Sequence, residues 1–247
     1  MGLKTEKDKK RYLTILADGK LHERVDEDTE GATIRTKKEQ DGTVVNVEDK
    51  DGNEIWELKY PGIVAKIKDI KFNEGDYGTN INIDLEDEDD NQFILSLQCA
   101  SNYGERFMEV LPNLDLNKEV DFTPYSFTPK GKSEKVRGLS ISQDDEKVES
   151  AFATKDGDEW EVLIKGFPMP DPKKKYNSEK WKTFFAQRRE WIMDYLLEAD
   201  LIKAADAEDD SAEEVEESDD ESPEEETKPK AKKAVAKKGK KGDDDDF

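Results

Sequence analysis

Residues 62–148 carry a pattern that constrains the fold more than any other part of the chain: runs in which apolar and polar residues alternate. A two-residue period is typical of strands with one buried face. The period changes once, after Ser101, where Phe107, Val110 and Leu111 have helical spacing. Ser101 is a suitable helix cap, and Pro112 with Asn113 would end the helix. The predicted order is strand, strand, strand, helix, strand, strand.

This order is that of the OB-fold, a five-stranded Greek-key barrel with a helix between its third and fourth strands. In the predicted fourth strand, Val120 and Phe122 point to one side, while Tyr125 and Phe127 point to the other. We therefore expect a mainly β fold with an OB-fold-like barrel that displays two aromatic rings on its non-core face.

The flanking segments predict additions to this barrel. Short strands are expected before it, with positive-φ turns at Asp41-Gly42 and Asp51-Gly52, over residues 12–16, 33–36, 44–47 and 55–60. Trp160, Val162 and Ile164 suggest one further strand, and residues 166–172 a stiff connector. An amphipathic helix capped by Ser178 should then run to about Lys203. Its rings either dock onto the barrel or form a subunit interface, which makes a homodimer possible.

Composition indicates where order ends. Only 33% of the 247 residues are hydrophobic, 41% are charged, and the net charge is −22. Residues 206–247 hold 18 acidic and 8 basic residues, a composition that favours disorder. We thus expect three parts: an OB-fold-like domain with its N-terminal extension (1–153), a strand, connector and helix (154–205), and an acidic, lysine-containing tail (206–247).

The sequence lacks the motifs that are typical of several classes of function. Cys99 and His22 are the only residues of their types, so a disulfide within the chain and a Cys/His zinc cluster are excluded. No phosphate-binding glycine loop or nucleophile elbow occurs, so we expect neither an enzyme nor a cofactor. No apolar run of about 18 residues occurs, and residues 1–11 are charged, so we expect a cytoplasmic protein without membrane spans or a signal peptide.

The candidate binding residues combine cations with aromatic rings. Sites for single-stranded nucleic acid use a cationic groove for the backbone and rings on which unpaired bases stack. We expect three rings to stack bases: Tyr77, Tyr125 and Phe127. We expect seven cations to neutralise phosphates: Lys66, Lys68, Lys71, Lys130, Lys132, Lys135 and Arg137. The alternative is that Tyr125 and Phe127 pack beneath the extra strands or the long helix, and that the lysines are ordinary loop residues.

The tail suggests a partner-binding segment. An apolar ring in Phe247 follows four carboxylates, in Asp243, Asp244, Asp245 and Asp246. A ring placed where no core can recruit it looks like a group that a partner grips, although a chain end tolerates almost any residue. The lysines of residues 228–241 would hold nucleic acid, or would serve only as a spacer or an import signal.

The chain resembles single-stranded DNA-binding proteins of tailed bacteriophages, including the T7-like type. The resemblance covers roughly residues 55–152 and the last five. The resemblance rests on five segments: residues 60–78, residues 114–116, residues 122–127, residues 138–143 and the Asp-Asp-Asp-Asp-Phe ending. The many acids in the barrel and the lysine run before the last Asp block depart from that pattern.

The resemblance implies a protein that coats single-stranded DNA in phage DNA replication and recombination, in the host cytoplasm. It also implies that residues 243–247 dock on a replication partner, a polymerase or a helicase. The charge blocks of the tail suggest in addition that it could cover the empty DNA groove. The alternative function is an acidic chaperone or scaffold that binds basic proteins through residues 206–226. A nuclease or other enzyme is disfavoured by the missing catalytic site.

Overall fold

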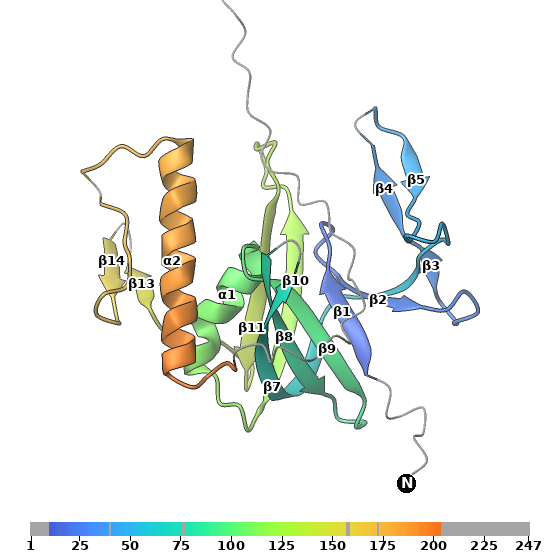
Figure 1. The fold of residues 1–247 in the computed structure, drawn as a ribbon, viewed down its shortest axis with the longest axis horizontal. Coiled ribbons are helices and arrows are strands. Elements are labelled where there is room, and N and C mark those ends of the chain that lie inside the picture. Colours follow the sequence, from blue (N-terminus) through green and yellow to red (C-terminus); the bar gives the residue numbers. More distant parts are fainter. Residues whose placement is uncertain (1–9, 40, 76–77, 157–158, 172, 204–247) are drawn as a thin grey trace, which may run out of the picture.

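The structure is a computed structural model that describes residues 10–39, 41–75, 78–156, 159–171 and 173–203. It is mainly β, as expected, with two α-helices (Figure 1). The strands are β1 (Arg11–Ile15), β2 (Leu21–Val25), β3 (Thr33–Ile34), β4 (Thr36–Lys38), β5 (Val44–Asn46), β6 (Trp56–Tyr60), β7 (Ile63–Gly75), β8 (Gly78–Glu86), β9 (Gln92–Gln98), β10 (Glu119–Phe127), β11 (Val136–Gln143), β12 (Glu146–Lys147), β13 (Ala153–Asp156) and β14 (Glu159–Val162). The helices are α1 (Asn102–Val110) and α2 (Ser178–Glu198).

Ten strands form one sheet in the order β12-β11-β10-β7-β8-β9-β1-β2-β6-β3. The five predicted strands are β7, β8, β9, β10 and β11, and α1 follows the third of them. These pairings leave the sheet open instead of closing it into a barrel. The free edge of β9 is taken by β1, which pairs with it in parallel, so β11 does not pair with β9.

The core lies under the strands whose alternation the sequence shows. Ile81, Ile83 and Leu85 of β8 are fully buried, as are Val120 and Phe122 of β10. Helix α1 packs against β9, β11 and α2. Its start is fixed as expected, because Ser101 Oγ accepts a hydrogen bond from the backbone N–H of Gly104 at 3.1 Å. A 3₁₀ turn over Leu111–Asn113 ends it.

The N-terminal extension differs in detail from the sequence expectation. Gly42 and Gly52 do adopt positive φ, at 90° and 81°. The expected two-residue hairpin turns at Asp41-Gly42 and Asp51-Gly52 do not form. Each loop has three residues, since the N–H of Glu39 donates to the carbonyl of Thr43 and the N–H of Asp49 donates to the carbonyl of Asn53. Strand β2 was not predicted, because its sequence Leu-His-Glu-Arg-Val places a histidine and a glutamate at buried positions.

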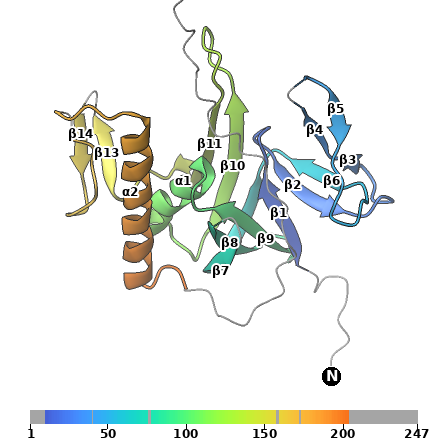
Figure 2. The same cartoon turned by 45° about the horizontal axis from the view of Figure 1, so that its top comes forward.

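Helix α2 stands beside α1 at one end of the molecule, next to the β13–β14 hairpin (Figures 1 and 2). Asn177 caps it, instead of the predicted Ser178: its side chain accepts from the N–H of Lys180 at 2.9 Å. The helix ends at Glu198, earlier than predicted, and the chain then returns to β7 through backbone hydrogen bonds of Lys203 with Ile70 and Phe72. None of the described helices has the length and apolar character needed to cross a membrane.

Candidate nucleic-acid interface

The β10–β11 hairpin extends beyond the rest of the sheet and carries both predicted rings of the fourth strand (Figures 1 and 2). Tyr125 is 39% exposed and Phe127 is 53% exposed. Their ring centroids are 6.0 Å apart, with 38° between the ring planes. These exposed fractions argue against the alternative that both rings pack beneath the extra strands or the long helix. The rings are therefore open to solvent, on the face of β10 opposite Val120 and Phe122.

The register of the hairpin determines what lies beside the rings. Tyr125 pairs with Gly138 and Phe127 pairs with Val136, and paired residues share one face of an antiparallel ladder. A Cβ atom at Gly138 would lie 2.3 Å from the hydroxyl oxygen of Tyr125, so the tyrosine ring occupies the space that a side chain would fill. Glycine at position 138 thus lets the Tyr125 ring lie flat across β11.

A second glycine lies against the hairpin close to its loop end. Gly19, in the loop between β1 and β2, has a φ of 73°. A Cβ atom there would lie 2.3 Å from the backbone nitrogen of Ser126. This close approach brings the β1–β2 loop against β10 directly behind Tyr125.

The predicted loop cations form the tip of the hairpin. Lys130, Lys132 and Lys135 are all exposed, in a turn where the N–H of Lys132 donates to the carbonyl of Pro129 at 3.0 Å. Arg137 is placed differently from the expectation. It pairs with Ser126 and is half-buried, so its side chain lies on the face of the ladder opposite the two rings. The three lysines therefore lie at the hairpin tip, beyond the two rings, whereas Arg137 lies on the opposite face of the ladder.

The β7 lysines lie farther from the rings than expected. Lys66 pairs with Glu119, six ladder positions from Tyr125, which is about 20 Å at 3.3 Å per residue. Lys68 Nζ lies 2.9 Å from Glu86, and Lys71 Nζ lies 3.8 Å from Asp69. Tyr77 and residues 243–247 lie outside the described residues.

A buried ionic network, which the sequence analysis missed, supports the β1–β2 loop. His22 Nε2 lies 2.9 Å from Asp18, in that loop, and its Nδ1 lies 2.9 Å from Glu57 on β6. Burial acts to lower the pKa of His22, but the two carboxylates outweigh it and raise the pKa. Burial acts to raise the pKa of Glu57, but His22, Arg35 and Lys59 lower it to about 2. The sequence around His22 did not indicate that Asp18 and Glu57 would contact this side chain.

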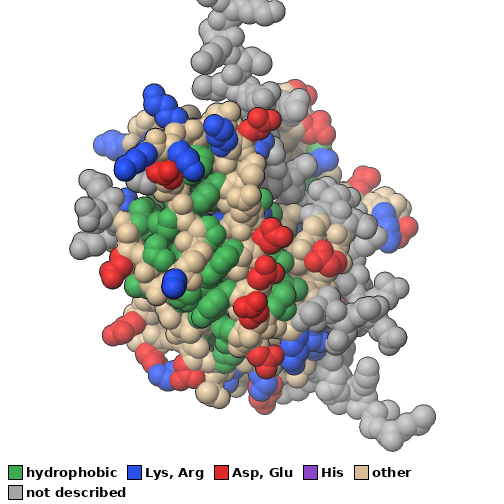
Figure 3. Space-filling view, turned by 60° about the vertical axis from the view of Figure 1, so that its left-hand side comes forward, with side chains coloured by type: hydrophobic (Ala, Val, Ile, Leu, Met, Phe, Trp, Pro, Cys, Tyr) green, Lys and Arg blue, Asp and Glu red, His purple; other side chains and the backbone are tan. Residues whose placement is uncertain are grey.

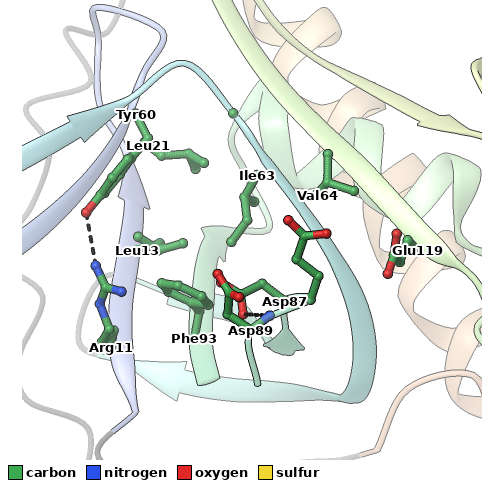
Figure 4. A pocket seen from close by; sticks show the side chains of 12 residues that line it. Arg11, Leu13, Leu21, Tyr60, Ile63, Val64, Asp87, Asp89, Phe93 and Glu119 are labelled. Atoms are coloured by element: carbon green, nitrogen blue, oxygen red, sulfur yellow. Dashed lines mark hydrogen bonds between the residues drawn. The ribbon is translucent and has the colours of Figure 1, made fainter. Parts of the chain in front are cut away.

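A cavity of about 570 Å³ lies between β1 and the start of β10 (Figure 4). Apolar side chains line one side of it: Leu13, Leu21, Ile63 and Phe93. Carboxylates lie around the rest: Asp87, Glu88, Asp89 and Glu119. The Arg11 guanidinium stacks over Phe93 at 4.8 Å and is held by Glu23 at 2.5 Å and by Tyr60 at 3.0 Å. Burial, together with Glu23, raises the pKa of Tyr60 to about 12.

Comparison with known proteins adds no relative: no family model, curated protein or solved structure matches the chain. Within the described ranges, no three His, Cys, Asp or Glu side chains are placed to share a metal ion. The candidate interface is therefore defined by its geometry: two neighbouring exposed rings on a projecting hairpin with a lysine-rich tip.

Proposed function

We propose that the protein binds single-stranded DNA through the β10–β11 hairpin. The observation that carries this proposal is the exposed pair Tyr125 and Phe127, next to a tip with Lys130, Lys132 and Lys135. Stacking of an unpaired base on an aromatic ring contributes roughly 1–3 kcal/mol and does not depend on the base. The lysines supply the charge for the phosphate backbone, so binding without strong sequence preference is expected.

The strand order supports the same proposal. The part β11-β10-β7-β8-β9, with α1 between the third and fourth strands in sequence, has the order of an OB-fold whose barrel is incomplete. In OB-folds the loops after the first and fourth strands flank the binding face. The fourth-to-fifth loop corresponds to residues 128–135, at the hairpin tip. The β7 lysines would then contact a strand that continues beyond the rings.

The role in phage DNA replication and recombination rests on the sequence resemblance. In this proposal, residues 243–247 dock on a polymerase or helicase and compete with DNA for the basic tip. Deleting residues 243–247 should tighten DNA binding at low salt and abolish partner recruitment. Unchanged DNA affinity together with unchanged recruitment would count against both roles.

A titration of the full chain with fluorescent oligo-dT tests the hairpin directly. The double variant Tyr125→Ala, Phe127→Ala should lose about 2–6 kcal/mol of binding free energy, if each ring stacks one base. The matched control is Val44→Ala with Leu116→Ala, which removes two exposed apolar side chains elsewhere. Equal affinities of the two double variants would refute the hairpin as the stacking site.

The salt dependence tests the lysines separately. Each phosphate contact contributes about −0.7 to the slope of log K against log salt concentration for single strands. Replacing Lys130, Lys132 and Lys135 with glutamine should therefore make the slope shallower by about 2. A slope that does not change would show that the tip makes no phosphate contact.

The cavity of Figure 4 favours a second candidate function, an acidic scaffold for basic proteins. Its apolar side and four carboxylates suit a lysine-rich segment. Binding of oligo-dT and of a histone-like polycation, each over a salt series, distinguishes the two. Tight polycation binding without oligo-dT binding would favour the scaffold.

A further inference from the structure

The amino-terminal half of α2 displays a row of stacked rings. Trp181 is 36% exposed and Phe185 is 40% exposed. Their ring centroids are 5.4 Å apart, with 20° between the planes. Tyr176, in the connector before the helix, stacks on Trp181 at 4.6 Å with 29° between the planes. Tyr176, Trp181 and Phe185 thus form a continuous stacked row at the molecular surface.

These rings do not serve to dock α2. Ile192 and Leu196, in the second half of the helix, are its buried residues. Arg188 and Arg189 form ion pairs with Glu109 and with Glu105 of α1. Because the anchoring groups lie in or next to the carboxyl-terminal half, the ring row is held on a fixed helix without being part of its interface.

Tyr176 and Trp181 lie within a basic stretch of the chain, and Phe185 follows shortly after it. Residues 165–182 hold two acids and six lysines: Lys165, Lys173, Lys174, Lys175, Lys180 and Lys182. The described lysines of this stretch are all exposed. Figure 3, in which this side of the molecule faces the reader, shows hydrophobic side chains gathered at the centre and lysine and arginine side chains along the upper edge. A chain of net charge −22 therefore presents a local cationic surface beside exposed rings.

The β13–β14 hairpin, on the same side of the molecule, repeats the combination (Figures 1 and 3). Trp160 is 53% exposed, and Lys155 Nζ lies 6.0 Å from its ring centroid. Val162 and Leu163 are exposed next to it. Aromatic rings with lysine ammonium groups nearby thus occur both on α2 and on the β13–β14 hairpin.

We propose that the α2 ring surface, defined as Tyr176, Trp181 and Phe185 with lysines 173–175, 180 and 182, is a second contact for single-stranded nucleic acid. The choice of ligand rests on the proposed function, while the site is separate from the β10–β11 hairpin. The rings at the two ends of the row, Tyr176 and Phe185, can extend the stack to an unpaired base, and the lysines match the phosphates in charge. A strand bound at both sites would run from the projecting hairpin to the far end of the molecule.

Charge also argues against a second copy of the chain as the occupant. In a two-fold symmetric dimer the same patch occurs on both sides of the interface. Two lysine-rich surfaces would then face each other, and like charges in apposition are unfavourable. Phosphates on a nucleic acid strand meet the same surface with opposite charge.

Ultraviolet cross-linking of the full chain to oligo-dT, followed by mass spectrometry of the peptides, tests the site without a substitution. Cross-links are expected on the peptide with Trp181 and Phe185 and on the peptide with Tyr125 and Phe127. Cross-links on the hairpin peptide alone would overturn this inference and leave the proposed function intact. Cross-links on the α2 peptide alone would support this inference and refute the hairpin site. Cross-links on neither peptide would refute both.

A second experiment measures the affinity of variants of the α2 ring surface for oligo-dT. The double variant Trp181→Ala, Phe185→Ala should bind oligo-dT at least about tenfold more weakly than the wild type, because it removes the end ring Phe185 and the central ring that holds the row together. Leu197→Ala, at the other end of the same helix and also exposed, is the control that should retain affinity. Sedimentation of the same variants tests whether a second copy of the chain occupies this face. A dimer that dissociates in the double variant, with oligo-dT affinity unchanged, would identify the face as a subunit interface and overturn the inference.

Discussion

The variant Glu57→Gln should reveal how strongly the buried ionic network stabilises the extension that supports the hairpin. Glu57 is 1% exposed and lies 2.7 Å from Arg35 and 3.0 Å from Lys59, as well as 2.9 Å from His22. A carboxyl whose pKa falls from 4.5 to about 2 on folding contributes about 3 kcal/mol to stability once it is ionised in both states.

The pH dependence follows from the sign of each pKa change. Because the folded pKa of Glu57 is lowered, its contribution is present above 4.5 and is lost as the pH falls toward 2. Because the folded pKa of His22 is raised, its contribution is fully present below 6.5 and is lost as the pH rises through the folded value. The network should therefore stabilise the fold most between pH 4.5 and 6.5.

Urea unfolding, followed by circular dichroism, measures the effect. At about pH 6 the variant should be about 3 kcal/mol less stable than the wild type, and the difference should shrink toward zero near pH 2. The control Glu27→Gln makes the same charge change at an exposed site and should cost under about 0.5 kcal/mol. A difference below about 1 kcal/mol at pH 6, or one that is the same at both pH values, would refute this account of the network.

Three further variants probe other parts of the structure. Gly138→Ala should displace the Tyr125 ring and weaken oligo-dT binding by about 1–3 kcal/mol, measured by fluorescence anisotropy, because the new methyl group takes the position of the ring. Phe107→Ala removes a fully buried ring and should cost about 3–5 kcal/mol in urea unfolding. Arg188→Met removes the ion-pair partner of Glu109, and burial already raises the pKa of that carboxyl. The stability lost by this variant at neutral pH should therefore be partly regained on acidification, when Glu109 is protonated.

The sequence was sufficient where local periodicity decides the structure. Alternation placed Val120 and Phe122 inside and Tyr125 and Phe127 outside, because side chains of a strand alternate between its faces. The cap of α1 at Ser101 followed from local chemistry in the same way. The exposure of the two rings was a prediction with an alternative, since alternation does not show whether another element covers the outer face.

Local sequence patterns of this kind could not predict which distant strands would pair. The parallel contact between β1 and β9 joins residues about 80 positions apart, and it is this contact that leaves the sheet open. Strand β2 was missed because Glu23 is buried only through its pairing with Arg11 and Tyr60. Helical spacing in α2 predicted one apolar face, yet it did not show that only its second half would be covered.

If the hairpin tip binds phosphate as proposed, the separation between the tip and the acids of β10 would limit their repulsion of the ligand. Glu119 and Asp121, at the start of β10, lie six to eight residues from Phe127, which is about 20–26 Å along the strand. The Debye length is about 10 Å at 0.1 M salt, so these carboxylates are largely screened from the tip under such conditions. At 0.01 M it reaches about 30 Å, and their repulsion of DNA should then be felt.

The gain in oligo-dT affinity on lowering the salt concentration should therefore level off below about 0.02 M, where the Debye length comes to match the separation. Glu119→Gln with Asp121→Asn should restore a straight plot of log K against log salt concentration, because it removes the nearest carboxylates of β10. The control is Glu27→Gln with Asp28→Asn, the same charge change in the β2–β3 loop. A plot that is straight in the wild type, or that levels off equally in both double variants, would show that the acids of β10 do not act on the tip.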